Sequence, residues 1–555
     1  MNHLHRRDAL RLGGAAVATS LAVACVPSAP AQPTPAAVPA SGPLPTYLPP
    51  SGGPKPDFLS SDPRITQGFI NYPTPVKTWT AAPPGSGGTL NVFVPAYYPQ
   101  PTARDQDPTW KAVEQALNST VNMIITAMAD YSTRLQVVMA GNDLPDTIHI
   151  VGTVANLISP QFVDSQCADL SPYLSGDAAR DYPNLAAIPG YAYQGAGGIF
   201  NNRLYGIPIQ RYLPAFWFFR NSDIWDAEIG ADVAPKDAAD FKKILQQLNR
   251  PQESRWAIGN SANGPASGSM YGLISFLEMF GAPNAWSLDS SGKLVRDRET
   301  DQYKAAISYM KDLMGSGLYP PDFQTAGDSR SAFIAGRFVV STEAFGNGWN
   351  DFWRRGLQQT PQRHYTIVGP FAADASLKPQ HYLTAGTVAY NVLKKGSPDR
   401  VREVLRILNY LAAPFGSEED LLLTYGLRDQ DFSMDANGNP IPSQQGLLNA
   451  GYVPWQYLAH RPYAWYQSDL PGYAKAAFDV EQTLVGIGVT NPTVGLHSAT
   501  QAKNAASEQA FYDGLADLLF NRRPFSDYDQ LVSDWRTSVG DTIRQEYLSE
   551  IQHKG

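Results

Sequence analysis

The side chains in this sequence that are best placed for ligand chemistry are aromatic residues that directly follow a predicted strand. Tyr97 and Tyr98 come after Thr89–Pro95, an alternating run with β-branched residues. Ligands of α/β sheets bind at the carboxyl ends of strands, and a tyrosine offers both an apolar ring face and a hydroxyl group. This pattern favours reversible binding of a polar ligand, and packing within a lobe is the alternative role.

The motifs of common catalytic sites are missing from the sequence. It contains no phosphate-binding loop and no HExxH, GxSxG or CxxC pattern, and its eight histidines do not pair at metal-ligand spacing. The run Asp435–Asn439 resembles a calcium loop, but its glycine is misplaced and the terminal glutamate is missing, so a hairpin turn at Asn437-Gly438 is favoured. Paired carboxylates that meet only in space stay open. We therefore expect no catalytic activity, cofactor or metal.

The elements that must position these residues are those of an α/β protein. A strand at 89–95 is followed by a predicted helix at 108–128 and by predicted strands at 134–139 and 145–151, which indicates a mainly parallel sheet. Apolar residues at helical spacing predict further helices at 238–248, 301–314, 399–411, 499–519 and 528–551.

The first 24 residues have the layout of an export signal. A basic start with Arg6-Arg7 resembles a twin-arginine leader, and a short Gly/Ala-rich apolar run ends at Ala24-Cys25. Ala24-Cys25 resembles the end of a lipobox, although Ala22 stands where leucine is usual. We expect lipidation of Cys25, with a plain cleaved signal peptide as the alternative. Cys167 would then have no disulfide partner.

Composition limits the partners of the mature chain. The formal net charge is −8, and removing the three arginines and one aspartate of residues 1–24 would make it −10. A protein with a negative net charge is a poor partner for nucleic acid, which is itself negatively charged. No apolar run after Cys25 is long enough to span a membrane. Residues 25–88 are rich in proline and alanine, so we expect a disordered tether.

Several segments resemble, in order, the family 1 extracellular solute-binding proteins, the sugar-binding components of ABC importers. They are Leu204–Pro208 with Phe218–Asn221, Phe333–Val340 with Ala344–Trp349, Pro398–Leu411, and the hairpin at 435–440. The resemblance covers about residues 89–550. Arg337 and Val340 depart from it, since lysine and methionine are commoner there.

The resemblance implies a periplasmic-binding-protein type II fold with two α/β lobes joined by a hinge. We expect lobe 1 at 89–209 and 366–415, lobe 2 at 210–365 and 416–555, and crossovers near Gln210 and His364–Val368. The implied protein is an exported monomer, lipid-anchored to the outer face of the cell membrane or periplasmic. It would capture an oligosaccharide for ABC permease subunits. A binding protein for a peptide or another polar solute and a secreted glycan-degrading enzyme are the alternatives.

The resemblance also adds candidate ligand-binding residues to Tyr97 and Tyr98. Trp349 stands where the family has an aromatic residue that stacks on sugar, and a core tryptophan is its alternative role. Crossover residues reach ligand in the family, and Glu343 could accept hydroxyl hydrogen bonds or form an interlobe ion pair. The remaining candidates are the crossover residues Gln210, Arg211 and Tyr212 and the loop residues Trp286 and Trp455.

Overall fold

The alternation of side chains along β2 (Thr89–Ala96) places two separate cores on the two faces of one sheet. Leu90, Val92 and Val94 belong to one buried cluster, and Phe93 belongs to another. Successive side chains of a strand point to opposite faces, so β2 lies in a middle layer with a core on each side.

The computed structural model describes residues 42–49, 53–80, 82–97, 101–141, 143–260, 270–324, 329–359 and 364–554. All of these belong to one compact unit that begins at Ala40. The predicted signal peptide, Cys25 and Tyr98 lie outside the described residues.

The sheet that contains β2 has five strands. In spatial order they are β3 (Thr120–Ala127), β2, β4 (Thr147–Val151), β15 (Thr387–Leu393) and β7 (Gly206–Gln210). β2 pairs in parallel with β3 and β4, whereas β15 is antiparallel to both β4 and β7. β2, β3, β4 and β7 therefore end at the same edge of the sheet, with Ala96 and Gln210 as the last residues of β2 and β7.

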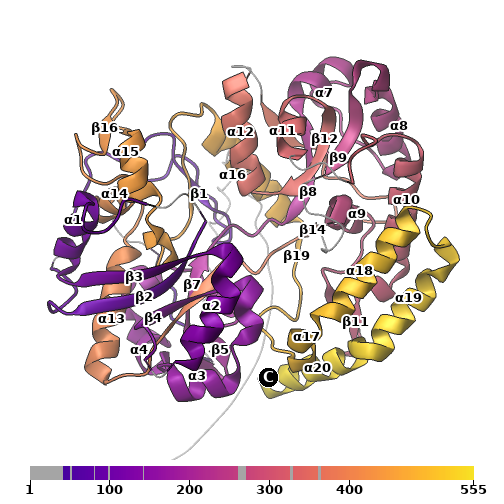
Figure 1. Cartoon of the computed structure of the whole chain (residues 1–555). Helices are drawn as coiled ribbons and strands as arrows, with labels where there is room; N and C mark the ends of the chain where they lie inside the picture. Colours follow the sequence, from indigo (N-terminus) through magenta and orange to yellow (C-terminus); the bar gives the residue numbers. More distant parts are fainter. Residues whose placement is uncertain are drawn as a thin grey trace, which may run out of the picture. The chain divides into compact units, whose positions relative to one another are not determined.

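Helices cover both faces of this sheet (Figure 1). The cluster with Leu90 and Val92 includes side chains of α1 (Pro108–Leu117) and α13 (Pro398–Leu411), and the cluster with Phe93 includes α2 (Met128–Ala140) and α3 (Pro160–Gln166). α1 begins where the Asp107 carboxylate accepts hydrogen bonds from the backbone N–H groups of Thr109 and Trp110, at 2.8 and 3.0 Å. Asn118, in a left-handed conformation with φ of 48°, ends it.

The second sheet has four strands, β13 (Tyr365–Ile367), β8 (Phe216–Asn221), β12 (Phe338–Ala344) and β9 (Trp256–Asn260). β12 is parallel to β9 and antiparallel to β8. One large apolar cluster contains this sheet and the helices around it, which are α8 (Ala238–Leu248), α9 (Leu273–Met279), α10 (Asp301–Gly315), α12 (Asn347–Gln359), α16 (Tyr473–Gly486), α18 (Ala505–Leu519) and α19 (Tyr528–Trp535).

The described structure also contains further α-helices and two-stranded pairs. The helices are α4 (Ser171–Leu174), α5 (Pro183–Ala186), α6 (Gly190–Gly195), α7 (Ser222–Glu228), α11 (Ser329–Ile334), α14 (Glu418–Tyr425), α15 (Gln444–Gly446), α17 (Ala499–Lys503) and α20 (Asp541–Lys554). The two-stranded pairs are β1 (Gln67–Gly68) with β18 (Ala464–Trp465), β5 (Ile199–Phe200) with β6 (Arg203–Leu204), β10 (Trp286–Leu288) with β11 (Leu294–Arg296), β14 (His381–Tyr382) with β19 (Gly488–Val489), and β16 (Phe432–Met434) with β17 (Pro440–Pro442). None of the described helices is both long and apolar enough to span a membrane.

Most predicted elements are confirmed, but two between residues 108 and 139 are wrong. The predicted helix at 108–128 ends at Leu117, and its second part is strand β3. The predicted strand at 134–139 belongs to helix α2, which buries Tyr131 and Leu135 at the four-residue spacing of one helical face. The helix predicted at 499–519 divides at Asn504, and the hairpin at 432–441 is confirmed.

We call the five-stranded sheet with the cores on its two faces the first half, and the four-stranded sheet with its core the second half. The chain passes between these halves at three crossovers. The first lies between Gln210 and Phe216, as predicted. The second was predicted at His364–Val368 but lies between Ile367 and Thr387, because Tyr365–Ile367 pairs with β8 in the second sheet. The third lies between Leu458, which is buried in the first half, and Trp465, which is buried in the second.

The expected lobe boundary at residue 416 is also wrong. Val453, Trp455 and Leu458 lie in the same core as α13, so residues up to about 459 belong to the first half. The later helices α16, α18 and α19 lie in the core of the second half. The extra return to the first half is the reason for the third crossover.

The segment predicted to be a disordered tether is ordered in its described part. We call the described residues between 42 and 80 the N-terminal strap. The strap contacts the first half through Leu48, whose backbone N–H donates to the Ala186 carbonyl at 2.9 Å, and the second half through Thr66, which bonds to Glu481. Ile65, Phe69 and Tyr72 are buried. These apolar side chains stand among the prolines, and their burial orders the segment.

Candidate functional site

Two tyrosine rings meet where β2 ends at the edge of the five-stranded sheet. Tyr97 follows β2 and is 47% exposed, and its ring centroid lies 5.0 Å from that of Tyr457. The imidazole of His149, from β4, also lies near Tyr457, at 5.5 Å between ring centroids. We call Tyr97, His149, Arg211, Tyr457 and His460 the strand-end cluster.

A buried amide holds Tyr457 in this position. The Asn391 side chain, on β15, donates to the backbone carbonyls of Tyr457 and Leu458 at 2.9 and 2.8 Å. Its oxygen accepts from the Nδ1 of His149 at 3.2 Å. Burial lowers the pKa of His149 to about 4, so this imidazole is neutral at neutral pH. Asn391 thus joins the first sheet to the start of the third crossover.

Arg211 supplies the positive charge of the cluster. Its backbone N–H donates to the Gly386 carbonyl at 2.8 Å, and its guanidinium donates to the Gln210 carbonyl at 2.9 Å. The charge acts on three members of the cluster. Burial raises the pKa of Tyr97 and Arg211 opposes this, while burial and nearby arginines, Arg211 among them, lower the pKa values of His149 and His460.

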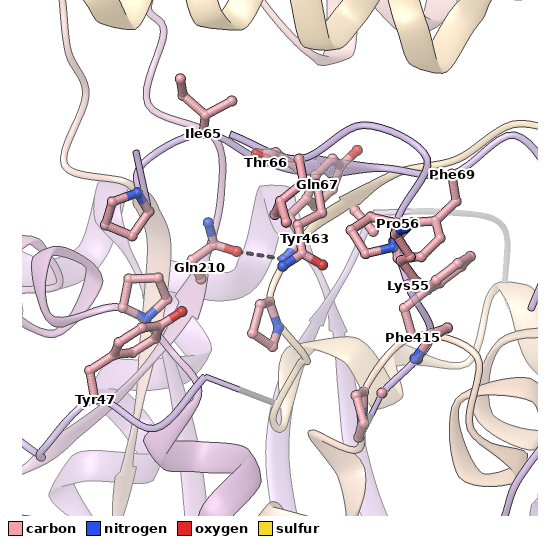
Figure 2. Close-up of a pocket in the computed structure, with 18 of the residues that line it drawn as sticks. Tyr47, Lys55, Pro56, Ile65, Thr66, Gln67, Phe69, Gln210, Phe415 and Tyr463 are labelled. Atoms are coloured by element: carbon pink, nitrogen blue, oxygen red, sulfur yellow. Dashed lines mark hydrogen bonds between the residues drawn. The ribbon is translucent and has the colours of Figure 1, made fainter. Parts of the chain in front are cut away.

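Gln210, the residue before Arg211, lines a cavity of about 340 Å³ under the N-terminal strap. Figure 2 shows its side chain beside Tyr463, whose backbone N–H donates to the Gln210 oxygen at 2.7 Å. The Gln210 amide nitrogen donates to the Tyr191 hydroxyl at 3.0 Å. The aromatic side chains that line the cavity are Tyr47, Phe69, Tyr191, Phe415 and Tyr463.

The residues of the first crossover therefore lie in different environments. Gln210 lines the cavity, whereas the charge of the adjacent Arg211 acts in the strand-end cluster. Tyr212 packs against the second half, with its ring stacked on Trp465 at 5.7 Å and edge-on to Phe345 at 5.8 Å. The alternation of neighbouring side chains in extended backbone produces this separation.

The structure places the other predicted site residues in the cores of the two halves. Trp349 is fully buried against Phe219 and Phe345, so in this conformation it presents no face to a ligand. Trp286 packs against Trp535 and Tyr547, and Trp455 packs against Trp110; each tryptophan is 2% exposed.

Glu343 is also buried. Its carboxylate forms an ion pair with Arg330 at 2.7 Å. Arg330 lies on α11, whose Phe333 and Ile334 belong to the same core as β12. The ion pair is therefore within one half, and the predicted interlobe ion pair is wrong.

Three members of the cluster were not predicted from the sequence. His149 stood inside a strand that was correctly predicted, and its position two residues before the carboxyl end of that strand was a usable signal. Tyr457 lies just before the third crossover and His460 lies on it, and no pattern predicted that the chain would return to the first half there. Within the described residues, no group of three or more His, Cys, Asp or Glu side chains could hold a metal ion.

Comparisons with known proteins agree with the geometry. A family model described as bacterial extracellular solute-binding protein matches residues 110–427. Lipoprotein LipO of Bacillus subtilis (strain 168) is 22% identical over 360 residues, which cover 63% of this chain and 68% of LipO. Polygalacturonan/rhamnogalacturonan-binding protein YtcQ of the same organism is 21% identical over 475 residues, which cover 84% of this chain and 92% of YtcQ.

A solved structure shares the fold. The N-glycan transport solute binding protein NgtS from Streptococcus pneumoniae superimposes with a TM-score of 0.58 at 14% identity, over 84% of this chain and all of the other. This confirms the predicted α/β fold of the periplasmic-binding-protein type II class. Because the family model matches more than half of the length of this chain, the chain belongs to the bacterial extracellular solute-binding protein family.

Proposed function

We propose that this protein captures an oligosaccharide outside the cell and delivers it to the permease subunits of an ABC transporter. The observation that carries the proposal is the half-exposed Tyr97 ring, which lies against Tyr457 beside the Arg211 charge. A sugar site needs an aromatic face for the apolar side of the ring and a few placed polar groups for its hydroxyls. The names of YtcQ and NgtS, which refer to a polysaccharide and to N-glycans, support this ligand class.

Ligand-induced thermal stabilisation tests the proposal. A ligand that binds only the native state raises the unfolding midpoint by mass action. A panel of oligosaccharides and of peptides is mixed with the protein, and the ligand is then recovered and analysed. We expect one or more oligosaccharides to raise the midpoint and to be recovered unchanged. Stabilisation by peptides alone would indicate a different solute, and shortened oligosaccharides would indicate an enzyme.

Two tyrosine variants locate the site. Tyr97→Ala removes the exposed ring of the strand-end cluster, whereas Tyr47→Ala removes a ring of similar exposure, 41%, from the cavity under the strap. We expect Tyr97→Ala to weaken oligosaccharide binding at least about tenfold, since an aromatic contact and its buried area are lost together. Tyr47→Ala is expected to bind normally. The reverse result would place the site in the cavity instead.

We also propose that the protein is exported by the twin-arginine-like leader and works as a monomer anchored through lipid on Cys25. The sequence Ala24-Cys25 and the lipoprotein name of the relative LipO support this location. A Cys25→Ala variant is expected to appear in the soluble fraction, whereas the wild type sediments with membranes. Retention of the variant on membranes would disprove the anchor without affecting the proposal on ligand binding.

A further inference from the structure

Arg211 carries a positive charge that no carboxylate of the described structure neutralises. Its guanidinium donates to one neutral group, the Gln210 carbonyl, and no described acidic residue forms an ion pair with it. The nearby arginine of the third crossover differs, because Arg461 pairs with the Asp420 carboxylate at 2.6 Å. The guanidinium therefore keeps donors available for a ligand.

The groups around Arg211 neither neutralise nor duplicate its charge. The Arg211 charge influences the pKa values of Tyr97, His149 and His460, and no acidic side chain is among the groups that shift these values. Both histidines are buried and their pKa values lie below the ordinary value, so they are neutral at neutral pH. The strand-end cluster thus has one net positive charge.

This local charge is opposite in sign to that of the protein as a whole. The formal net charge of the chain is −8, which disfavours the approach of an anionic ligand. The guanidinium can donate to the hydroxyls of a neutral sugar, but only an anionic sugar adds an ion pair to these hydrogen bonds. A site for an anionic sugar needs one, because the local interaction must exceed the general repulsion.

We propose that the ligand is an acidic oligosaccharide, and that Arg211 binds the carboxylate of one uronic acid residue while a ring of the same chain stacks on Tyr97. The planar fork of the guanidinium matches the two oxygens of a carboxylate, and such charge-assisted pairs are among the strongest polar contacts. Tyr97 and Arg211 follow β2 and β7, which end at the same sheet edge with β4 and β15 between them. At about 4.8 Å per strand the two strand ends are about 14 Å apart, a span that an oligosaccharide of a few units covers. This inference rests on the proposed function.

Calorimetry with matched ligands tests the inference. Oligosaccharides of galacturonate, glucuronate and mannuronate are each compared with the same chain after reduction of its carboxyl groups. For the acidic ligand that binds, we expect the reduced form to bind at least about tenfold more weakly, since one charge-assisted pair is lost. The difference is expected to shrink as the salt concentration rises from about 0.02 to about 0.2 M.

Variants assign the preference to one side chain. Arg211→Gln is expected to bind the acidic and the reduced ligand with similar affinity, and Arg211→Lys is expected to keep part of the preference. Arg180→Gln, which removes an exposed arginine paired with Asp177, is the matched control and is expected to behave like the wild type. An unchanged thermal midpoint of each unliganded variant shows that it is folded.

The outcomes separate the two proposals. If neutral oligosaccharides bind as tightly as acidic ones, or if Arg211→Gln keeps the full preference, the acidic-ligand inference is wrong and the proposed function stands. If no oligosaccharide binds, acidic or neutral, both are wrong.

Discussion

Glu481 is expected to make this protein less stable as the pH rises from about 4.5 to about 7. The carboxyl group is fully buried on α16 and accepts hydrogen bonds from the Trp465 indole at 2.7 Å and from the backbone N–H and hydroxyl of Thr66 at 3.0 and 2.9 Å. No basic side chain neutralises it among the described residues. Burial raises its pKa to about 7 from the ordinary 4.5.

The magnitude follows from linkage between protonation and folding. The folded protein binds the Glu481 proton more tightly than the unfolded chain does. The free energy of unfolding is therefore highest below pH 4.5, falls between pH 4.5 and about 7, and is constant above. Since each pH unit between the two pKa values corresponds to about 1.4 kcal/mol, the loss is about 3 kcal/mol.

A Glu481→Gln substitution removes the ionisation and retains the hydrogen bonds. The amide oxygen can accept from the Trp465 indole and the Thr66 backbone, which both point at one carboxylate oxygen, and the amide nitrogen can donate to the Thr66 hydroxyl. We expect this variant to be more stable than the wild type by about 3 kcal/mol at pH 8 and equally stable at pH 4.5.

Urea unfolding at both pH values measures the effect, and Glu508 provides a matched control. Glu508 also accepts from a tryptophan indole, that of Trp535 at 2.7 Å, but it pairs with Arg298 at 2.9 Å. Burial would raise its pKa, but Arg298, Arg296 and the Trp535 hydrogen bond together outweigh burial and lower it. Glu508→Gln is expected to be less stable than the wild type at pH 8. If Glu481→Gln is also destabilised at pH 8, the reasoning on burial without a charge partner is refuted.

Three further variants test contacts described above by urea unfolding and ligand titration. Arg461→Met leaves the buried Asp420 carboxylate without its charge partner and is expected to cost about 3–5 kcal/mol; a cost below about 1 kcal/mol would contradict this. Trp349→Ala is expected to cost about 3–5 kcal/mol and Trp349→Phe less, since the buried indole nitrogen has no hydrogen-bond partner among the described residues. The phenylalanine variant should keep its ligand affinity. Asn391→Ala removes one hydrogen-bond donor from each of the Tyr457 and Leu458 carbonyls, so it is expected to cost about 1–3 kcal/mol and to weaken ligand binding. Normal binding would show that Tyr457 does not need this support.

The N-terminal strap adds contacts between the two halves beyond the three crossovers. Thr66 bonds to Glu481 in the second half, and Tyr72, six residues later, donates to Asp420 in the first half at 3.1 Å. Any relative movement of the halves must preserve or break these bonds. The proline-rich composition of the segment predicted disorder because a composition reflects only how many residues of each type are present. Whether the segment is ordered depends on the burial of a few particular side chains.

The sequence by itself determined the elements whose signals are local. Apolar residues at helical spacing located α8, α10 and α13, and alternation located β2 and β4, because these patterns reflect which face of an element is buried. The order of the degenerate motifs along the chain was enough to identify the family. The position of Tyr97 after β2 identified one residue of the candidate site.

The tertiary structure alone decided which side chains meet. Trp349 resembled a ligand-binding residue in the sequence, but packing against Phe219 and Phe345 buries it. His149 and Tyr457 are more than 300 positions apart and are brought together by Asn391 on β15. Arg211 became a candidate for anion binding only because the acidic side chains of the described structure lie elsewhere, and such a long-range arrangement of charges leaves no pattern in a single sequence.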